Sequence, residues 1–360
     1  MARPTIQDVA DLAGVSKATV SAVLNDKSTV NERTREEVLE AMRRLSYRPR
    51  PGARGRLHTE GPRSIAFVQR EIANPYFSEV VAGAESYLRE RGYVLLVAAS
   101  EGDFRAEQRI IRLFTLRDVD GILLTPVLDD ETDLSHIFDM KRRNISFVLL
   151  EEIRGIQANL VDVDNVEGAK AAARHLMDLG HVHIAHFVGP EYSLHSQERL
   201  EGVRRAYSES RLVFSSDLVV PAGNSLEQGY QAGLEYFRDR QPEDRPTAVT
   251  CYNDLCALGL CRALDEVGLR VPTDVSVIGF DDLQLLDFLP PASRLTTIHV
   301  PKFEVGRTAA EILHAEIEGA GPAAPRKVYL KAELVVGQTT APPAATPRTV
   351  GSTAADRDAG

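Results

Sequence analysis

From residue 63 onward, the sequence alternates short apolar segments with amphipathic segments of helical periodicity. The apolar segments have the length of buried strands, and strands that alternate with helices are typical of parallel sheets built from βαβ units. None approaches the roughly 20 apolar residues that a membrane helix needs. The expected strands form two series, which predicts two α/β lobes: 64–68, 93–99, 119–127 and 145–150, then 159–164, 183–189, 218–222, 247–252 and 275–280.

The helices expected between these strands have well-marked starts. Asn74-Pro75 supplies an N-cap followed by proline at the first helical position, and Asn165 and Asn253 also follow expected strands. The C-terminal ends of parallel strands border the ligand crevice in open α/β sheets. These polar residues therefore either line a ligand site or serve only as good caps. The expected helices include 75–91, 165–179, 195–209, 226–240 and 254–267.

Charge is distributed unevenly along the 360 residues, whose formal net charge is −10. Residues 1–63 hold 12 Lys and Arg against 8 Asp and Glu, whereas the rest of the chain holds 30 against 44. A basic head on an acidic body indicates that only the head meets a polyanion such as DNA. The first ten residues lack the apolar core of a signal peptide, and the three cysteines lack CxxC spacing. We therefore expect a cytoplasmic protein with reduced structural thiols.

The residue pattern of the basic head predicts three short helices. Thr5 is a plausible N-cap with Asp8 as its capping-box partner, Gly14 is suited to end the first helix, and Ser16 can cap a second. A third helix is expected at 32–45. A tight glycine-containing turn between two such helices predicts a helix-turn-helix unit, whose second helix enters the DNA major groove. A small packing bundle without a ligand is the alternative.

The segments "TIQDVADLAGVSKATVSAVLN" and "TREEVLEAMRRLSYRP" resemble the DNA-binding domain of the LacI/GalR family of bacterial transcription regulators. The resemblance implies that Lys17, Ala18 and Ala22 read bases. Position 22 is commonly arginine in that family, and alanine offers only a methyl contact, for instance to thymine. The residues implied to contact or orient on phosphates are Thr5, Ser16, Thr19, Ser21, Asn25 and Thr34.

The linker at 49–62 resembles the family's hinge, which forms a short helix on DNA and inserts a leucine into the minor groove. Here Ala53 and Arg54 precede Leu57, the candidate wedge, with one residue more than the family pattern has. Nearby glycines weaken a helix by ~1 kcal/mol each relative to alanine. A flexible basic tether that touches phosphates is the alternative.

The family resemblance extends through "NPYFSEVVAGAESYLRERGY", "VDGILL", "GPEYSLHSQERLEG", "NDLCALG", "VPTDVSVIGFDD" and "LTTI". It implies a core of two Rossmann-like lobes, similar to periplasmic sugar-binding proteins, that closes on a small molecule. Residues 1–48 would form the head, 63–158 plus 299–323 the N-lobe, and 159–298 plus 326–340 the C-lobe. Residues 341–360 have a composition typical of disorder and lack leucine heptads, which predicts a homodimer rather than a tetramer.

The resemblance also implies which residues hold the effector. Arg199 matches an arginine that grips hydroxyls or a carboxylate with its planar fork, and Asn253 and Asp281 match positions that hydrogen-bond sugar hydroxyls. A surface salt bridge is the alternative for Arg199, and a surface position is the alternative for His195. Asn224 stands where some relatives place a stacking aromatic residue. The remaining candidates are Tyr76, Phe77, Glu151, His195 and Gln197.

Catalytic and cofactor motifs are missing from the sequence. It has no GxxxxGK[ST], no GxGxxG after the first expected strand, no histidine spacing typical of zinc sites and no nucleophile–base motif. We therefore expect no enzyme activity, cofactor or metal. The sequence predicts a repressor that binds a near-palindromic operator as a dimer and responds to a small molecule, which the resemblance implies is a sugar or sugar derivative. The alternatives are a solute-binding protein or carbohydrate-active enzyme with a fused head, and an architectural DNA-binding protein.

Overall fold

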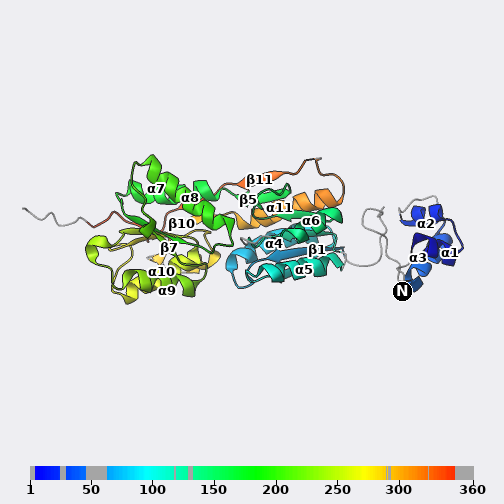
Figure 1. Cartoon of the computed structure of the whole chain (residues 1–360), viewed down its shortest axis with the longest axis horizontal. Helices are drawn as coiled ribbons and strands as arrows, with labels where there is room; N and C mark the ends of the chain where they lie inside the picture. The colour runs from blue at the N-terminus through cyan, green and yellow to red at the C-terminus, as the bar shows by residue number, and fades with distance from the viewer. Residues whose placement is uncertain are drawn as a thin grey trace, which may run out of the picture.

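The computed structural model describes residues 5–24, 30–45, 63–116, 119–128, 133–288, 290, 293–322 and 324–344. Figure 1 shows the helical head and the α/β body. Asn25, Ala53, Arg54 and Leu57 lie outside the described residues. The whole hinge at 49–62 and the tail from 345 onward also lie outside them. No helix in the described ranges is long and apolar enough to span a bilayer.

The head consists of α1 (Ile6–Ala13), α2 (Lys17–Leu24) and α3 (Glu32–Leu45). Thr5 and Asp8 form the predicted capping box, and Gly14 ends α1 with a φ of 64°, a conformation that glycine adopts without strain. Ser16 Oγ accepts a hydrogen bond from the backbone N–H of Thr19 at 3.0 Å. The helices enclose a small apolar core of Val9, Ala10, Val20, Val23, Leu24, Val38, Ala41 and Met42.

The first lobe contains a parallel sheet of six strands in the order β11-β5-β4-β3-β1-β2. Ile65 and Phe67 of β1 face the core shared with α4 and α11, whereas Ala66 and Val68 face the core shared with α5 and α6. This alternation places helices on both faces of the sheet. The strands are β1 (Arg63–Gln69), β2 (Tyr93–Ala99), β3 (Gly121–Leu124), β4 (Ser146–Leu149), β5 (Asn159–Val163) and β11 (Lys327–Leu330); the helices are α4 (Pro75–Arg89), α5 (Phe104–Leu116), α6 (Ser135–Arg142) and α11 (Lys302–Ile317).

The second lobe contains a parallel sheet of four strands in the order β7-β6-β8-β9. In Figure 1, α7 and α8 lie above this sheet and α9 and α10 lie below it. A short antiparallel pair, β10 with β12, adjoins it through a bridge between Ile278 and Thr296. The strands are β6 (Ile184–Val188), β7 (Val219–Pro221), β8 (Ala248–Cys251), β9 (Ser276–Ile278), β10 (Thr297–His299) and β12 (Glu333–Val335); the helices are α7 (Asn165–Asp178), α8 (Leu194–Glu209), α9 (Leu226–Phe237) and α10 (Asp254–Glu266).

Three boundary predictions need correction. The segments 159–164 and 326–340 were expected in the second lobe, but β5 pairs with β4 and β11 in the first sheet, and only the later part of 326–340, with β12 paired to β10, lies in the second lobe. The chain therefore enters the second lobe only after β5. Asp164, rather than Asn165, caps α7. Disorder was expected from residue 341, yet Ala341 N donates to Ser276 Oγ at 3.1 Å.

Helices α4 and α11 pack against each other backbone to backbone. Gly83 of α4 faces the carbonyl oxygen of Phe303, and Gly306 of α11 faces that of Val80. A Cβ atom at either glycine would overlap the facing carbonyl group. The absence of a side chain at these two positions therefore sets the distance between the helices, which fixes the start of α4 and the start of α11 beside the cleft.

Candidate effector site and DNA-contact helix

The outer face of α2 carries the predicted DNA-contact residues. Lys17 and Ala18 are exposed in the first turn, while Thr19, Ser21 and Ala22 are partly exposed. Ser16 Oγ lies 2.9 Å from Thr19 Oγ1, so the two hydroxyls are positioned together at the start of the helix. Thr5 is exposed and Thr34 is partly buried in the first turns of α1 and α3. The second helix thus presents one small polar surface with a single lysine at its N-terminal end.

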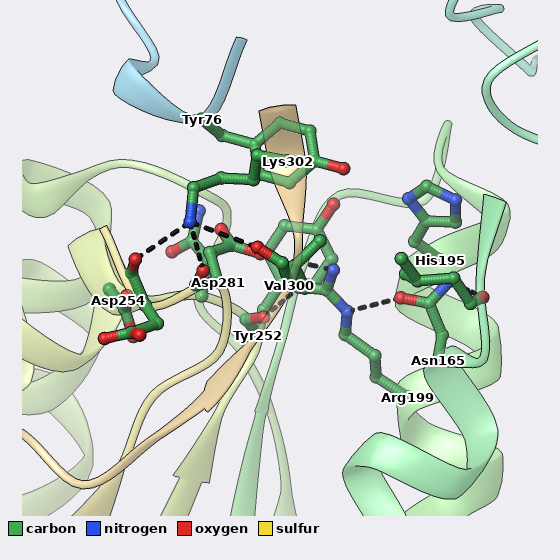
Figure 2. A network of polar contacts seen from close by, with 12 residues as sticks. Tyr76, Asn165, His195, Arg199, Tyr252, Asp254, Asp281, Val300 and Lys302 are labelled. Carbon is green, nitrogen blue, oxygen red and sulfur yellow. Dashed lines mark hydrogen bonds and ion pairs between the residues drawn. The ribbon is translucent and has the colours of Figure 1, made fainter. Parts of the chain in front are cut away.

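Arg199 of α8 is buried, so it is no surface salt bridge, and it joins three elements of the cleft (Figure 2). Its Nε donates to Asn165 Oδ1 at 3.0 Å, one terminal nitrogen donates to the carbonyl of Tyr252, and the other lies 3.4 Å from Asp281 Oδ1. The guanidinium also stacks 3.7 Å above the Phe280 ring. Its fork is held in one orientation, which is the preorganisation that a ligand clamp needs.

Asp281 lies at the end of β9 in a strained backbone conformation, with a φ of 111°. Such strain is concentrated at functional sites because the surrounding structure must hold it in place. Burial, opposed by the charges of Arg199 and Lys302, raises the pKa of Asp281 to about 6. Burial and the nearby Asp281 carboxylate also raise the pKa of Asp254, whose oxygens accept from Thr297 and the backbone of Leu283.

Glu151 follows β4 of the first lobe and caps α8 of the second. Its side chain accepts hydrogen bonds from the backbone N–H groups of Leu194 and His195, and it pairs with the buried Arg70. A carboxylate at a helix N-terminus is favoured by the orphan N–H groups and the helix dipole. Burial alone would raise the pKa of Glu151, but the charges of Arg70 and His195 and the hydrogen bonds lower it. Glu151 is therefore a charged link between the lobes.

A second link between the lobes centres on Glu71, directly after β1. Glu71 Oε1 accepts from Asn224 Nδ2 at 2.6 Å and from the Tyr192 hydroxyl at 3.0 Å. The Asn224 carbonyl in turn accepts from Asn253 Nδ2 at 2.8 Å. Asn253 Oδ1 caps α10 by accepting from the backbone N–H of Cys256. Asn224 and Asn253 are thus already engaged in protein hydrogen bonds.

Tyr76 and Phe77 open α4 on the first-lobe side, and their rings meet edge to face with centroids 5.2 Å apart. Figure 2 shows the Tyr76 ring above the Lys302 and Arg199 contacts. The space beside these rings is about 10 Å³, at the lower limit for holding one water molecule, and His195 closes its second-lobe side. Binding of a larger ligand therefore requires the lobes to separate or these side chains to move.

All of the predicted effector residues except Gln197 lie together. Tyr76, Phe77, Glu151, His195, Arg199, Asn224, Asn253 and Asp281 all lie at the facing edges of the two lobes. Gln197 is exposed, and its side-chain oxygen accepts from Arg154 at 3.3 Å. His195 is buried, contrary to the surface alternative, with Nδ1 3.5 Å from Glu151 and Nε2 2.9 Å from Asp162.

Several residues of the cleft were not predicted from the sequence. Arg70 and Glu71 directly follow β1 and Asp162 lies within β5, so a charged residue at a strand end was the available signal. Glu198 and Lys302 gave no such signal, because each lies among other charged residues of a helical segment. Lys302 is buried and donates to the carbonyls of Asp281, Asp282 and Val300.

Two family models match the sequence. Residues 5–50 match the bacterial regulatory proteins of the lacI family, and residues 173–340 match a periplasmic binding protein-like domain. The first region covers the helical head, and the second runs from α7 through β12. The two matches thus cover the parts that carry the α2 surface and most of the cleft.

Whole-chain relatives have the same organisation. The chain is 36% identical over 314 residues to the HTH-type transcriptional repressor PurR of Vibrio cholerae serotype O1 (strain M66-2), covering 87% of this chain and 91% of that one. It resembles the transcriptional regulator CelR in complex with cellobiose at 30% identity and a TM-score of 0.69, covering 94% of this chain and 100% of that one. It resembles the lac repressor dimer bound to operator and the anti-inducer ONPF at 28% identity, a TM-score of 0.69 and the same two coverages.

Proposed function

The chain belongs to the LacI family of bacterial regulatory proteins, and from this we propose that it is a dimeric repressor whose operator binding is controlled by a polyhydroxylated effector held between its lobes. The helical head binds the operator, and the two-lobed body binds the effector. A dimer places two heads on the two halves of a near-palindromic site, since protein and operator share two-fold symmetry. The lac repressor structure, a dimer on operator DNA, supports this arrangement.

Operator recognition is assigned to α2. The exposed Lys17 and Ala18 begin the helix, and the Ser16 and Thr19 hydroxyls lie beside them. In a helix-turn-helix unit the N-terminal residues of the second helix contact base edges, and hydroxyl groups contact phosphates. Ala22 offers a methyl group rather than a hydrogen-bond donor. Lys17 is therefore the main candidate for polar base readout within α2.

The effector class follows from the acceptors that surround Arg199, and this observation carries the proposal. The carboxylates of Glu71, Glu151, Asp162, Glu198 and Asp281 gather at the facing edges of the lobes near the guanidinium fork of Arg199, and the other buried guanidinium among them, that of Arg70, is already paired with Glu151. Hydroxyl groups donate to such acceptors, whereas a phosphate or carboxylate ligand would be repelled. A sugar or polyol suits this site, and CelR, whose structure contains cellobiose, supports the same class.

Aromatic faces on the second-lobe side of the cleft are partly covered by Arg199. Arg199 covers the Phe280 ring at 3.7 Å and approaches the Tyr252 ring at 4.7 Å. Asn224, rather than an aromatic residue, stands beside Glu71 and Tyr192. A nucleoside base gains most of its affinity from aromatic faces and matched hydrogen bonds, so this cleft favours a saturated ring.

The test combines a ligand screen with operator titration. Neutral sugars and polyols, and separately nucleosides, are screened by thermal shift, and hits are added to operator titrations followed by fluorescence anisotropy. We expect sugars to raise the melting temperature and to weaken operator binding. Asp281→Asn should lose both responses, whereas Glu243→Gln, an exposed change before β8 at the opposite edge of the sheet, should keep them.

Two outcomes would contradict the proposal in different ways. Responses to nucleosides alone would refute the effector class while leaving the repressor assignment intact. A chain that lacks residues 1–62 and still binds operator would refute the head as the DNA-binding domain. A solute-binding protein with a fused head predicts ligand binding without any effect on DNA.

A further inference from the structure

We propose that Asp162, His195 and Glu198 form a binding site for a divalent transition-metal cation that bridges the two lobes. The sequence has no histidine spacing typical of zinc sites, and these residues come from different segments of the chain. Asp162 lies on β5 of the first sheet, whereas His195 and Glu198 lie three residues apart on α8 of the second lobe. One ligand atom from each residue lies within 4.8 Å of the others.

The orientation of the His195 ring is the observation that points to a ligand. His195 is 6% exposed, and its Nε2 lies 2.9 Å from Asp162 Oδ1, yet Nε2 has no hydrogen-bond partner among the described residues. The two atoms are close but not aligned as donor and acceptor. Atoms that ligate one ion behave in this way, since both direct lone pairs at a common point rather than at each other.

The surroundings of the three residues resemble the outer shell of a metal site. His195 Nδ1 lies 3.5 Å from Glu151, Asp162 Oδ1 accepts from the backbone N–H of Val163 at 2.7 Å, and Glu198 Oε2 accepts from Asn165 Nδ2 at 3.0 Å. Metal-ligating histidines commonly direct their second nitrogen at a carboxylate, and ligating carboxylates are themselves hydrogen-bonded. Glu198 is partly exposed, which provides a path for an ion to enter.

A bound dication would balance the negative charge of the carboxylates at this site. Glu151 is neutralised by Arg70, which leaves the carboxylates of Asp162 and Glu198 facing His195. One imidazole nitrogen with two carboxylates suits Zn²⁺ or Mn²⁺, whereas Mg²⁺ and Ca²⁺ favour oxygen ligands alone.

A cation at this position would be coupled to the effector clamp. Asn165 donates to Glu198 and accepts from Arg199, so a shift of Glu198 toward an ion is transmitted to the guanidinium. Because the ion would tie β5 to α8, it would also restrain movement between the lobes. Metal and effector affinities should then change each other by the same factor.

The experiment uses the full chain, stripped of metal by a chelator and free of effector and DNA. Isothermal titration with Zn²⁺, Mn²⁺ and Mg²⁺ measures binding, and Co²⁺ reports the ligand type by its absorption spectrum. We expect one equivalent of Zn²⁺ or Mn²⁺ per chain, much weaker Mg²⁺ binding, and a Co²⁺ spectrum without thiolate bands. Glu198→Gln and Asp162→Asn should each weaken binding by about tenfold or more.

Control variants separate this site from other candidates. Glu201→Gln changes an exposed carboxylate on the same helix, and it should bind metal as the wild type does. Retention of the wild-type affinity by both Glu198→Gln and Asp162→Asn would overturn the proposal, as would thiolate bands in the Co²⁺ spectrum or failure of Zn²⁺ and Mn²⁺ to bind. Circular dichroism confirms that each variant is folded, and Glu198→Gln, at a partly exposed position, keeps the test valid if Asp162→Asn does not fold.

Discussion

Lys302 Nζ donates a hydrogen bond to the backbone carbonyl of Asp281 at 2.7 Å, which joins the first turn of α11 in the first lobe to the loop after β9 in the second (Figure 2). The same ammonium group donates to Asp282 and Val300 and lies 3.5 Å from Glu79. It therefore fixes the segment through which the chain returns to the first lobe, close to the strained backbone of Asp281.

Replacement of this lysine should destabilise the fold. Lys302→Met keeps the apolar stem but leaves the carbonyls without their buried donor, so we expect the free energy of unfolding to fall by about 3 kcal/mol. The control Lys331→Met removes an exposed lysine with a solvent-screened partner and should change stability by less than about 1 kcal/mol. Urea unfolding measures both, and equal stability losses would show that the Lys302 network contributes nothing specific.

Arg199→Lys tests the guanidinium fork while keeping the positive charge. Lysine cannot hold Asn165, the Tyr252 carbonyl and Asp281 at once, so the effector response should disappear at the wild-type effector concentration. Operator affinity without effector should stay within about threefold, which is under ~1 kcal/mol. Arg205→Lys, an exposed change on the same helix, serves as the control in operator titrations. A normal response in Arg199→Lys would exclude this residue as the clamp.

Lys17→Ala separates base readout from phosphate neutralisation. If the ammonium group contacts a base edge, specific binding should weaken by ~1–3 kcal/mol and the preference at one operator position should relax. Contact with phosphate alone predicts a uniform loss over all sequences and a shallower salt dependence. Selection from randomised operators distinguishes the two cases, and unchanged affinity would place Lys17 outside the interface.

His186 of β6 should make stability dependent on pH. Burial, with the charges of Arg199 and Arg204 and against the contact with Thr250, lowers the pKa of His186 to about 3. The unfolded chain, with a histidine pKa of about 6.5, therefore binds more protons than the folded chain as the pH falls from about 6.5 toward 3. This group alone should reduce the free energy of unfolding by up to about 1.4 kcal/mol per pH unit in that window.

Urea unfolding of the wild type and His186→Gln between about pH 4.5 and 7.5 measures this contribution. The difference between the two curves isolates His186 from His195, for which the charges of Asp162 and Glu151 outweigh burial and raise the pKa. The wild type should lose more stability than the variant toward low pH. Parallel curves would show that His186 titrates alike in the folded and unfolded chains.

Gly306→Ala should destabilise the first lobe because its new methyl group would overlap the Val80 carbonyl across the α4–α11 contact. We expect a loss of about 1–3 kcal/mol, typical of overpacking, despite the higher helix propensity of alanine. Thermal unfolding measures the change. Ala315→Gly, a partly exposed change in the same helix, shows the effect of helix propensity alone. A melting temperature of Gly306→Ala at or above that of the wild type would contradict tight packing here.

The sequence by itself determined the local structure of this protein. Thr5 with Asp8, Gly14, and Asn74-Pro75 marked helix ends that the structure confirms, because a cap depends on residues only a few positions apart. The apolar segment at 93–99 was predicted with the observed bounds of β2. The effector residues that the resemblance implied, apart from Gln197, also gather at one cleft, since the C-terminal ends of parallel strands share an edge.

Only the tertiary structure decided which segments meet. The apolar pattern of 159–163 fits a strand in either lobe, and its place in the first sheet depends on pairing with β4. The strand on its other side, β11, comes more than 160 residues later in the chain. The approach of Asp162 to His195 and the burial of Lys302 likewise depend on chain crossings between the lobes. Hydrophobic periodicity records which face of an element is buried, but it does not identify the partner that buries it.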